Sequence, residues 1–174
     1  GDTILMHAGL YRPDRLNYVD PLSAPFTGSW SLSLKGTTEK PITIKSAGDG
    51  EVIFDGAGNH KLFDVMGTQH HIFDGLTFRN TEVVFFAGDK EVMGAVGLTV
   101  KNCRFEDIGV GVWTEYAGSS DFYIADNLFL GREDQMRLIG WNQAGSRAAG
   151  IYPSHQLRSF FAVKVYEIGR ASCR

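Results

Sequence analysis

The sequence lacks clustered positive charge and long apolar segments. Its 17 lysines and arginines are outnumbered by 20 aspartates and glutamates, giving a formal net charge of −3 with no basic run. Nucleic-acid binding needs clustered lysine and arginine to neutralise phosphates, so the composition argues against a nucleic-acid partner. No apolar stretch approaches the roughly 20 residues that span a bilayer, which argues against a membrane span.

Cysteine is scarce, and helical periodicity is missing. The two cysteines, Cys103 and Cys173, cannot build a disulfide framework and fit no metal-ligand spacing. Cys103 sits in an apolar pattern and is expected to be a small buried side chain. No long segment repeats its apolar residues with a period of 3.6, so a helical fold is disfavoured.

What the sequence does contain is a repeat. Short strand-like runs end on phenylalanines at intervals of 24, 27 and 24 residues: Phe54, Phe78, Phe105 and Phe129. Three residues before the last three of these stand Gly75, Asn102 and Asp126. Glycine, asparagine and aspartate tolerate the left-handed backbone conformation better than other residues. A tight bend at one fixed position in every repeat would select them.

Each repeat also has room for a third strand, about ten residues after its phenylalanine. The runs LFDVM, VVFF and VGVWTEY occupy these places, and GDKEVMGAV lengthens the middle unit by one turn. The spacing predicts an all-β parallel β-helix, a solenoid with three short strands per coil and about four to five coils. An antiparallel sandwich is the rival fold, but it does not require a constant interval with a bend at constant phase.

Several segments carry a family resemblance. GDTI, GLYR, KGTTEKPITIKSAGDGEVIFDG, LTVKNCRF and IADNLF resemble the right-handed parallel β-helix superfamily of pectate lyases. The opening segments are similar to the N-terminal coils of the alginate lyase and chondroitinase B branch. The resemblance covers about residues 1–130 and 158–166 and implies a right-handed solenoid, a carbohydrate-active function and a secreted or cell-surface location in a bacterium. No catalytic motif matches, so the resemblance transfers no catalytic residue.

The expected domain organisation follows from the repeat. Residues 1–166 are interpreted as the N-terminal part of one β-helix domain, truncated at both ends, with a long loop insertion at 131–159. No secretory signal peptide is present in this fragment, which starts at GDTILM as if inside a longer sequence. The last eight residues, EIGRASCR at 167–174, resemble the translation of a common sequencing adapter and are interpreted as an artefact, with a natural tail as the alternative.

Strand alternation then predicts which side chains face outward. In VGVWTEY, Val110, Val112 and Thr114 are expected on the core face and Trp113 and Glu115 on the outer face. Aligning FFAVKVY with this strand places Lys164 beside Trp113 and Tyr166 beside Glu115. From the earlier repeats, Leu62 and Phe86 are expected in the Trp113 row and Asp64 in the Glu115 row.

This outer surface is the predicted site. Aromatic rings stack on sugars, and a lysine can neutralise a sugar carboxylate or abstract the adjacent proton; Lys164 is the candidate catalytic base. Asp64 and Glu115 are candidate Ca²⁺ ligands, although stacking would leave them about 9–10 Å apart. The candidate substrate-binding residues are Trp113, Tyr166, Arg132, Arg137, Trp141 and His155. The structural alternatives are a tryptophan covered by a neighbouring turn and a solvated lysine. For His70 and His71, turn and core roles are expected.

Two functions of different classes remain open. The first is a polysaccharide lyase or glycoside hydrolase acting on an acidic polysaccharide. The alternative is a non-catalytic β-helix that serves as a surface binding or structural module.

Overall fold

A computed structural model describes residues 1–12, 30–89, 93–131 and 161–165 of the chain. Every regular element in these ranges is a β-strand, so the described part of the protein is all-β, as predicted. Within it there is no helix of the length and hydropathy needed to cross a membrane.

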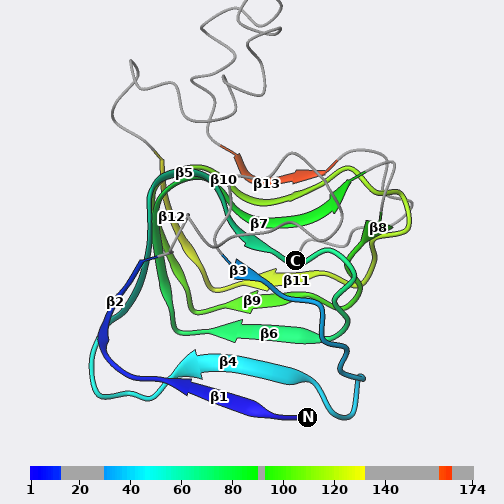
Figure 1. The fold of residues 1–174 in the computed structure, drawn as a ribbon, viewed down its shortest axis with the longest axis horizontal. Coiled ribbons are helices and arrows are strands. Elements are labelled where there is room, and N and C mark those ends of the chain that lie inside the picture. The colour runs from blue at the N-terminus through cyan, green and yellow to red at the C-terminus, as the bar shows by residue number, and fades with distance from the viewer. Residues whose placement is uncertain (13–29, 90–92, 132–160, 166–174) are drawn as a thin grey trace, which may run out of the picture.

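The strands form two sheets that the chain visits in turn (Figure 1). The five-stranded sheet has the order β1 (Thr3–Met6), β4 (Ile42–Ser46), β6 (His71–Asp74), β9 (Thr99–Lys101), β11 (Tyr123–Ala125). The eight-stranded sheet has the path β12 (Leu128–Gly131), β10 (Arg104–Thr114), β7 (Thr77–Asp89), β5 (Val52–Asp64), β2 (Gly9–Tyr11). We call each strand of the first sheet, with the strand of the second sheet that follows it, a rung.

The three long strands β5, β7 and β10 each have two legs. The first leg of β5 pairs with β2 and its end pairs with β3 (Trp30–Ser31). The first leg of β10 pairs with β12 and its second leg with β13 (Phe161–Val165). All of these pairings are parallel. Among the described strands, only β8 (Met93–Gly94) pairs antiparallel, with the end of β7. That hairpin lies in the segment GDKEVMGAV, where a lengthened turn was expected.

Left-handed residues mark the corners between strands. Gly75, Asn102 and Asp126 follow β6, β9 and β11 and have φ angles of 69°, 53° and 55°. The predicted bend is therefore confirmed at all three positions. Side chains disfavour this conformation unless they are glycine, asparagine or aspartate, so each corner constrains the residue that can occupy it.

Residues with positive φ also occupy two further sets of corners, which the sequence analysis did not identify. Asn80 and Asp107, with φ of 55° and 49°, separate the two legs of β7 and β10. Just before the first sheet's strands, the corner residues are His70, Gly97 and Asp121, with φ of 50°, 68° and 59°.

The core lies between the two sheets and is built from rows of side chains in register. Phe54, Phe78, Phe105 and Phe129 pair directly across neighbouring strands, with ring centroids 5.8, 5.3 and 4.4 Å apart. The predicted inward phenylalanine row is therefore confirmed. Tyr11 extends it, stacked on Phe54 at 5.2 Å. Buried aromatic pairs add about 0.5–1.5 kcal/mol each beyond the area that they bury, so this row is a main source of stability.

Cysteine and histidine also take the places expected of them. The Cys103 side chain is buried in the core, and burial raises the pKa of its thiol to about 11. His71 is buried, its Nδ1–H donates to the Gln69 carbonyl oxygen at 3.2 Å, and burial lowers the pKa of its ring. His70 occupies the corner before β6.

The predicted row alignment was wrong in the first long strand. Asp64 pairs with Phe86, which pairs with Trp113, so Asp64 belongs to the Trp113 row and not to the Glu115 row. Leu62 is in the core cluster and not in an outward row. The cause is a bulge: four residue steps from Asp55 to Asn59 lie opposite only two steps in β7.

A smaller shift occurs at the end of β10. Thr114 pairs with Gly88, one residue later in β7 than the preceding Trp113–Phe86 pair would give. Val110, expected on the core face, instead belongs to a second apolar cluster together with Trp113.

Candidate functional site

The predicted site lies along the second legs of β5, β7 and β10. Two rows of residues there flank a core row. One row runs Lys61, Val83, Val110, and the other runs Asp64, Phe86, Trp113. Met66, Val83, Phe86, Val110 and Trp113 form an apolar cluster separate from the main core, and we call it the outer cluster. This arrangement places Lys61 in the row on one side of the core row and Asp64 in the Phe86–Trp113 row on the other side.

Trp113 lies in the outer row as expected, but its ring is covered. The side chain is 5% exposed, and the ring meets Phe86 edge-on with centroids 5.8 Å apart. The indole is therefore packed against protein in this structure and is not open to solvent. Its contact with a sugar ring stays a prediction.

Lys61 is the functional candidate that sequence reasoning missed. Its Nζ lies 3.3 Å from the centroid of the Phe86 ring, and the residue is 5% exposed. A cation over an aromatic ring is stabilised by about 0.5–2 kcal/mol, more when water is excluded. The bulge before Asn59 pairs Lys61 with Val83 of the outer cluster, and a fixed repeat interval could not have revealed that pairing.

Asp64 is buried as well, and part of its role is local. Its Oδ1 accepts a hydrogen bond of 2.9 Å from the Met66 backbone N–H, which holds the turn that follows β5. Glu115 is half-buried and follows β10, where its backbone N–H donates to the Gly88 carbonyl at 2.9 Å. The two carboxylates start from different rows, contrary to the alignment that suggested them as a Ca²⁺ pair. Across the described ranges, His, Cys, Asp and Glu side chains form no group of three or more able to hold a metal ion.

The register of the last described strand is the predicted one. In β13, Val163 pairs with Val112, and Lys164 pairs with Trp113. The backbone of the candidate base therefore continues the row that contains Phe86 and Trp113. The other predicted binding residues lie outside the described residues: Arg132, Arg137, Trp141, His155 and Tyr166.

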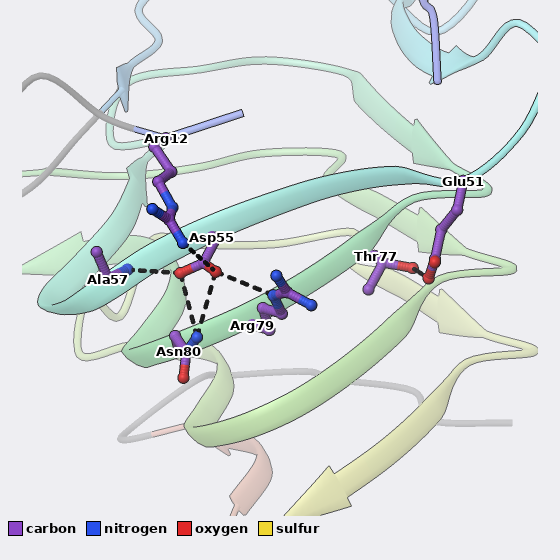
Figure 2. Close-up of polar contacts among 7 residues, drawn as sticks. All are labelled: Arg12, Glu51, Asp55, Ala57, Thr77, Arg79 and Asn80. Atoms are coloured by element: carbon purple, nitrogen blue, oxygen red, sulfur yellow. Dashed lines mark hydrogen bonds and ion pairs between the residues drawn. The ribbon is translucent and has the colours of Figure 1, made fainter. Parts of the chain in front are cut away.

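A second polar constellation occupies the corner between the legs of β5 and β7 (Figure 2). Asp55 is 1% exposed, and its Oδ1 accepts hydrogen bonds from the Ala57 N–H at 2.8 Å and from Asn80 Nδ2 at 3.2 Å. Its Oδ2 accepts from Arg79 Nε at 3.0 Å, and an Arg12 guanidinium nitrogen lies 3.7 Å away. Arg12 follows β2, so this one carboxylate links three successive rungs.

The electrostatics of Asp55 fit a structural role. Burial alone would raise the pKa of its carboxyl group, but the hydrogen bonds from Ala57, Arg79 and Asn80 outweigh burial and lower it. The carboxylate is thus charged at neutral pH, and both of its oxygens accept hydrogen bonds. A group held in this way stabilises the corner and has no oxygen left exposed for a ligand.

Comparison with known proteins adds no relative, since no family model, no curated protein and no solved structure matches the chain.

Proposed function

We propose that the chain is a right-handed parallel β-helix of the pectate lyase-like superfamily, with about four to five coils, and that it acts on an acidic polysaccharide as a lyase or glycoside hydrolase. A secreted or cell-surface location belongs to the same proposal. The parallel stacking of strands in two sheets supports the fold. The observation that carries the function is the outer cluster on the second legs, where the Lys61 Nζ lies over the ring of Phe86 and that ring packs against Trp113.

The chemistry of this face suits an anionic sugar. A lyase must neutralise the sugar carboxylate and remove the adjacent proton, so it needs a cation and a base close to one sugar unit. Lys61 offers the cation in this proposal, and Lys164 is assigned as the base. A Ca²⁺ ion held by Asp64 or Glu115 could share the neutralising role. The arginines Arg132 and Arg137 are assigned to sugar carboxylates, and Trp141, His155 and Tyr166 to the groove wall.

A non-catalytic binding or structural module is the second candidate. It is favoured by the burial of Trp113 and Lys61, which are 5% exposed each. Side chains that are packed in this way stabilise the fold, and they contact a ligand only after the residues that cover them have moved.

The discriminating experiment combines a turnover assay with a binding assay. The full chain is screened against a panel of uronate polysaccharides for the ultraviolet absorbance of the unsaturated product, with and without Ca²⁺, and for retention in affinity electrophoresis. A lyase gives absorbance and retention, a hydrolase gives new reducing ends in a parallel reducing-sugar assay without the absorbance, and a binding module gives retention alone. Absence of turnover and of retention on every glycan would overturn the proposal.

Substitutions of single lysines test which residues form the site. Lys164→Ala should abolish turnover while keeping retention, whereas Lys35→Ala, at an exposed position in another part of the fold, should change neither. Lys61→Met keeps an apolar chain on the Phe86 ring and removes the charge, so it should weaken retention on acidic glycans and spare neutral ones. Equal behaviour of Lys61→Met and wild type would exclude this face as the site of carboxylate recognition.

A further inference from the structure

The outer face of the first legs carries charges of alternating sign. Phe78 points into the core, so alternation along β7 turns Arg79, the next residue, outward. Arg79 pairs across the strands with Asp55 of β5 on one side and with Glu106 of β10 on the other. Arg12, which follows β2, reaches Asp55 from the opposite side of β5 (Figure 2). The row therefore contains arginine, aspartate, arginine and glutamate in this order.

A third arginine lies beside this row. Arg104 comes two residues before Glu106 on β10, so both side chains leave the same face, and Arg104 Nε donates to Glu106 Oε1. In the same way, Arg79 Nε donates to Asp55 Oδ2 at 3.0 Å. We call Arg12, Arg79 and Arg104, together with these two carboxylates, the arginine surface.

The terminal nitrogens of two of these guanidinium groups are open to a ligand. A guanidinium group has five N–H donors, and Nε accounts for one of them. Within the described ranges, the terminal nitrogens of Arg79 and Arg104 donate to no protein acceptor. The two side chains are 33% and 46% exposed although each is held at Nε. Guanidinium groups fixed in this way can bind carboxylate or sulfate oxygens with little further loss of side-chain entropy.

The charge balance of the arginine surface favours an anionic ligand. Three guanidinium groups are opposed by two carboxylates, and the Asp55 side chain is only 2% exposed. A ligand therefore meets mainly guanidinium nitrogens. Glu51 is the acidic neighbour on this face, where it accepts a hydrogen bond of 2.9 Å from Thr77 Oγ1 (Figure 2). The anionic groups of a ligand are accordingly expected over the row of Arg79 and not over Thr77.

The spread of the arginines favours a polymer over a small anion. They belong to three strands of the stack, β2, β7 and β10, and neighbouring strands lie about 4.8 Å apart. Each guanidinium group already has a carboxylate beside it, so a single small anion gains little from any one of them. A polymer with repeated anionic groups reaches several guanidinium groups at once, and the high effective concentration raises its overall affinity.

We infer that the arginine surface is a second glycan-binding site, which holds a linear anionic polysaccharide along the stack through carboxylate or sulfate groups of the polymer. Asn80 and Asp107 separate it from the outer cluster, because they divide the two legs of β7 and β10. The inference rests on the proposed function for the class of ligand alone, since no residue of the arginine surface takes part in the proposed turnover. Asp55 and Glu106 position the guanidinium groups, and the guanidinium groups bind the polymer.

Two exposed arginines can be changed without unpairing the buried carboxylate. Arg12→Gln and Arg104→Gln each remove one guanidinium group, while the hydrogen bond from Arg79 to Asp55 stays in place. Each variant should bind anionic polymer about three- to tenfold more weakly than wild type, and the double variant should show the product of both losses. Arg104→Lys keeps the charge but loses the planar fork, so its affinity should lie between those of wild type and Arg104→Gln.

Affinity electrophoresis gives the dissociation constants, with circular dichroism to verify the fold of each variant. The gels contain polygalacturonate, dextran sulfate or neutral dextran, and the anionic polymer that wild type binds more tightly identifies the preferred oxyanion. Free galacturonate or inorganic sulfate should compete about a hundredfold or more weakly per anionic group than the polymer. Equal competition by the small anions would overturn the polymer as the ligand.

Lys101→Gln is the matched control. Lys101 lies on β9, in the same rung as Arg104, and it is partly exposed and paired with Asp74 at 3.3 Å, but it belongs to the other sheet. The change removes the same charge, so it should leave the dissociation constant as in wild type. Equal losses in Lys101→Gln and Arg104→Gln would show attraction by net charge alone and would overturn the inference.

This inference and the proposed function fail separately. Wild-type affinity of the double variant, no retention by either anionic polymer, or equal retention by neutral dextran would overturn the second site, whether or not the protein turns over a polysaccharide. Retention that depends on both arginines but comes without turnover would support the second site and count against the enzyme.

Discussion

Replacement of Asp55 by asparagine tests whether the corner carboxylate holds successive rungs together. Asp55→Asn keeps the size of the side chain and one acceptor oxygen, but it removes the charge and turns an NH₂ group toward Arg79 or toward the Ala57 N–H. The four contacts of the carboxylate, with Arg12, Arg79, Asn80 and Ala57, then cannot all be made (Figure 2).

The expected magnitude follows from burial and from the exposure of the partners. A hydrogen bond to a charged group contributes about 1.5–3 kcal/mol, and breaking a fully buried ion pair costs about 3–5 kcal/mol. The Arg79 and Arg12 side chains are 33% and 61% exposed, so water can solvate them after the change. We therefore expect the free energy of unfolding at pH 7 to fall by about 2–3 kcal/mol, mainly through lost charge-assisted hydrogen bonds.

The pH dependence has a definite sign. The pKa of Asp55 is lower in the folded protein than its ordinary value, because its hydrogen bonds outweigh the opposing effect of burial. A carboxylate of this kind stabilises the fold above its unfolded pKa, and this contribution is lost as the pH falls through the folded pKa. The difference in stability between wild type and Asp55→Asn should thus be complete at pH 7 and should shrink below about pH 4.

Urea unfolding followed by circular dichroism from pH 3 to pH 7 measures both quantities. Asp126→Asn is the control, since it makes the same chemical change at an exposed corner with a φ of 55°, where asparagine is equally tolerated. A loss below about 0.5 kcal/mol at pH 7, no larger than ordinary surface substitutions produce, or a difference that does not change with pH, would refute the structural role of Asp55.

Three further predictions concern the core and the corners. Phe78→Ala should lower the free energy of unfolding by about 3–5 kcal/mol because it opens a cavity in the buried phenylalanine row; a loss under about 1 kcal/mol in urea unfolding would contradict the row's importance. Asn102→Val should cost about 1–3 kcal/mol through a β-branched residue at positive φ and through loss of the 2.8 Å hydrogen bond to Asp74, while Asn102→Gly should cost less. With its pKa raised to about 11 by burial, Cys103 should resist iodoacetamide in the native protein and react in urea, as peptide mass mapping can show; rapid native labelling would disagree with this burial.

The interval of the phenylalanines and the first set of corners could be predicted because the sequence encodes them locally. A corner at Asn102 needs a residue that tolerates positive φ, and a stacked row at Phe105 needs the same apolar side chain at the same phase. Both requirements place the same kinds of residue at fixed intervals along the sequence. The corner at Asn80 and Asp107 left the same signal, at the interval of 27 residues that separates Phe78 from Phe105, and could have been found in the same way.

The alignment of the outer rows could not be predicted from a constant interval. The bulge between Asp55 and Asn59 exists only relative to the partner strand β7, and no local pattern states how many residues face each other across two strands. Burial of Trp113 and Lys61 also escaped prediction, because alternation says to which side a residue points and not what covers that side.

The similar spacing between most paired strands has a consequence for how the chain folds. Most partners in the stack are about two dozen residues apart, as Phe54 is from Phe78 and Phe105 is from Phe129, however many rungs the stack contains. The entropy lost in closing such a loop depends on its length, so each new rung meets a similar barrier. The first pairing has no template, whereas every later strand finds an edge already ordered, and folding should therefore nucleate once and spread outward. Lengthening such a stack adds further steps of similar difficulty. It does not add contacts of growing sequence separation, and such contacts are what slows the folding of most large β-proteins.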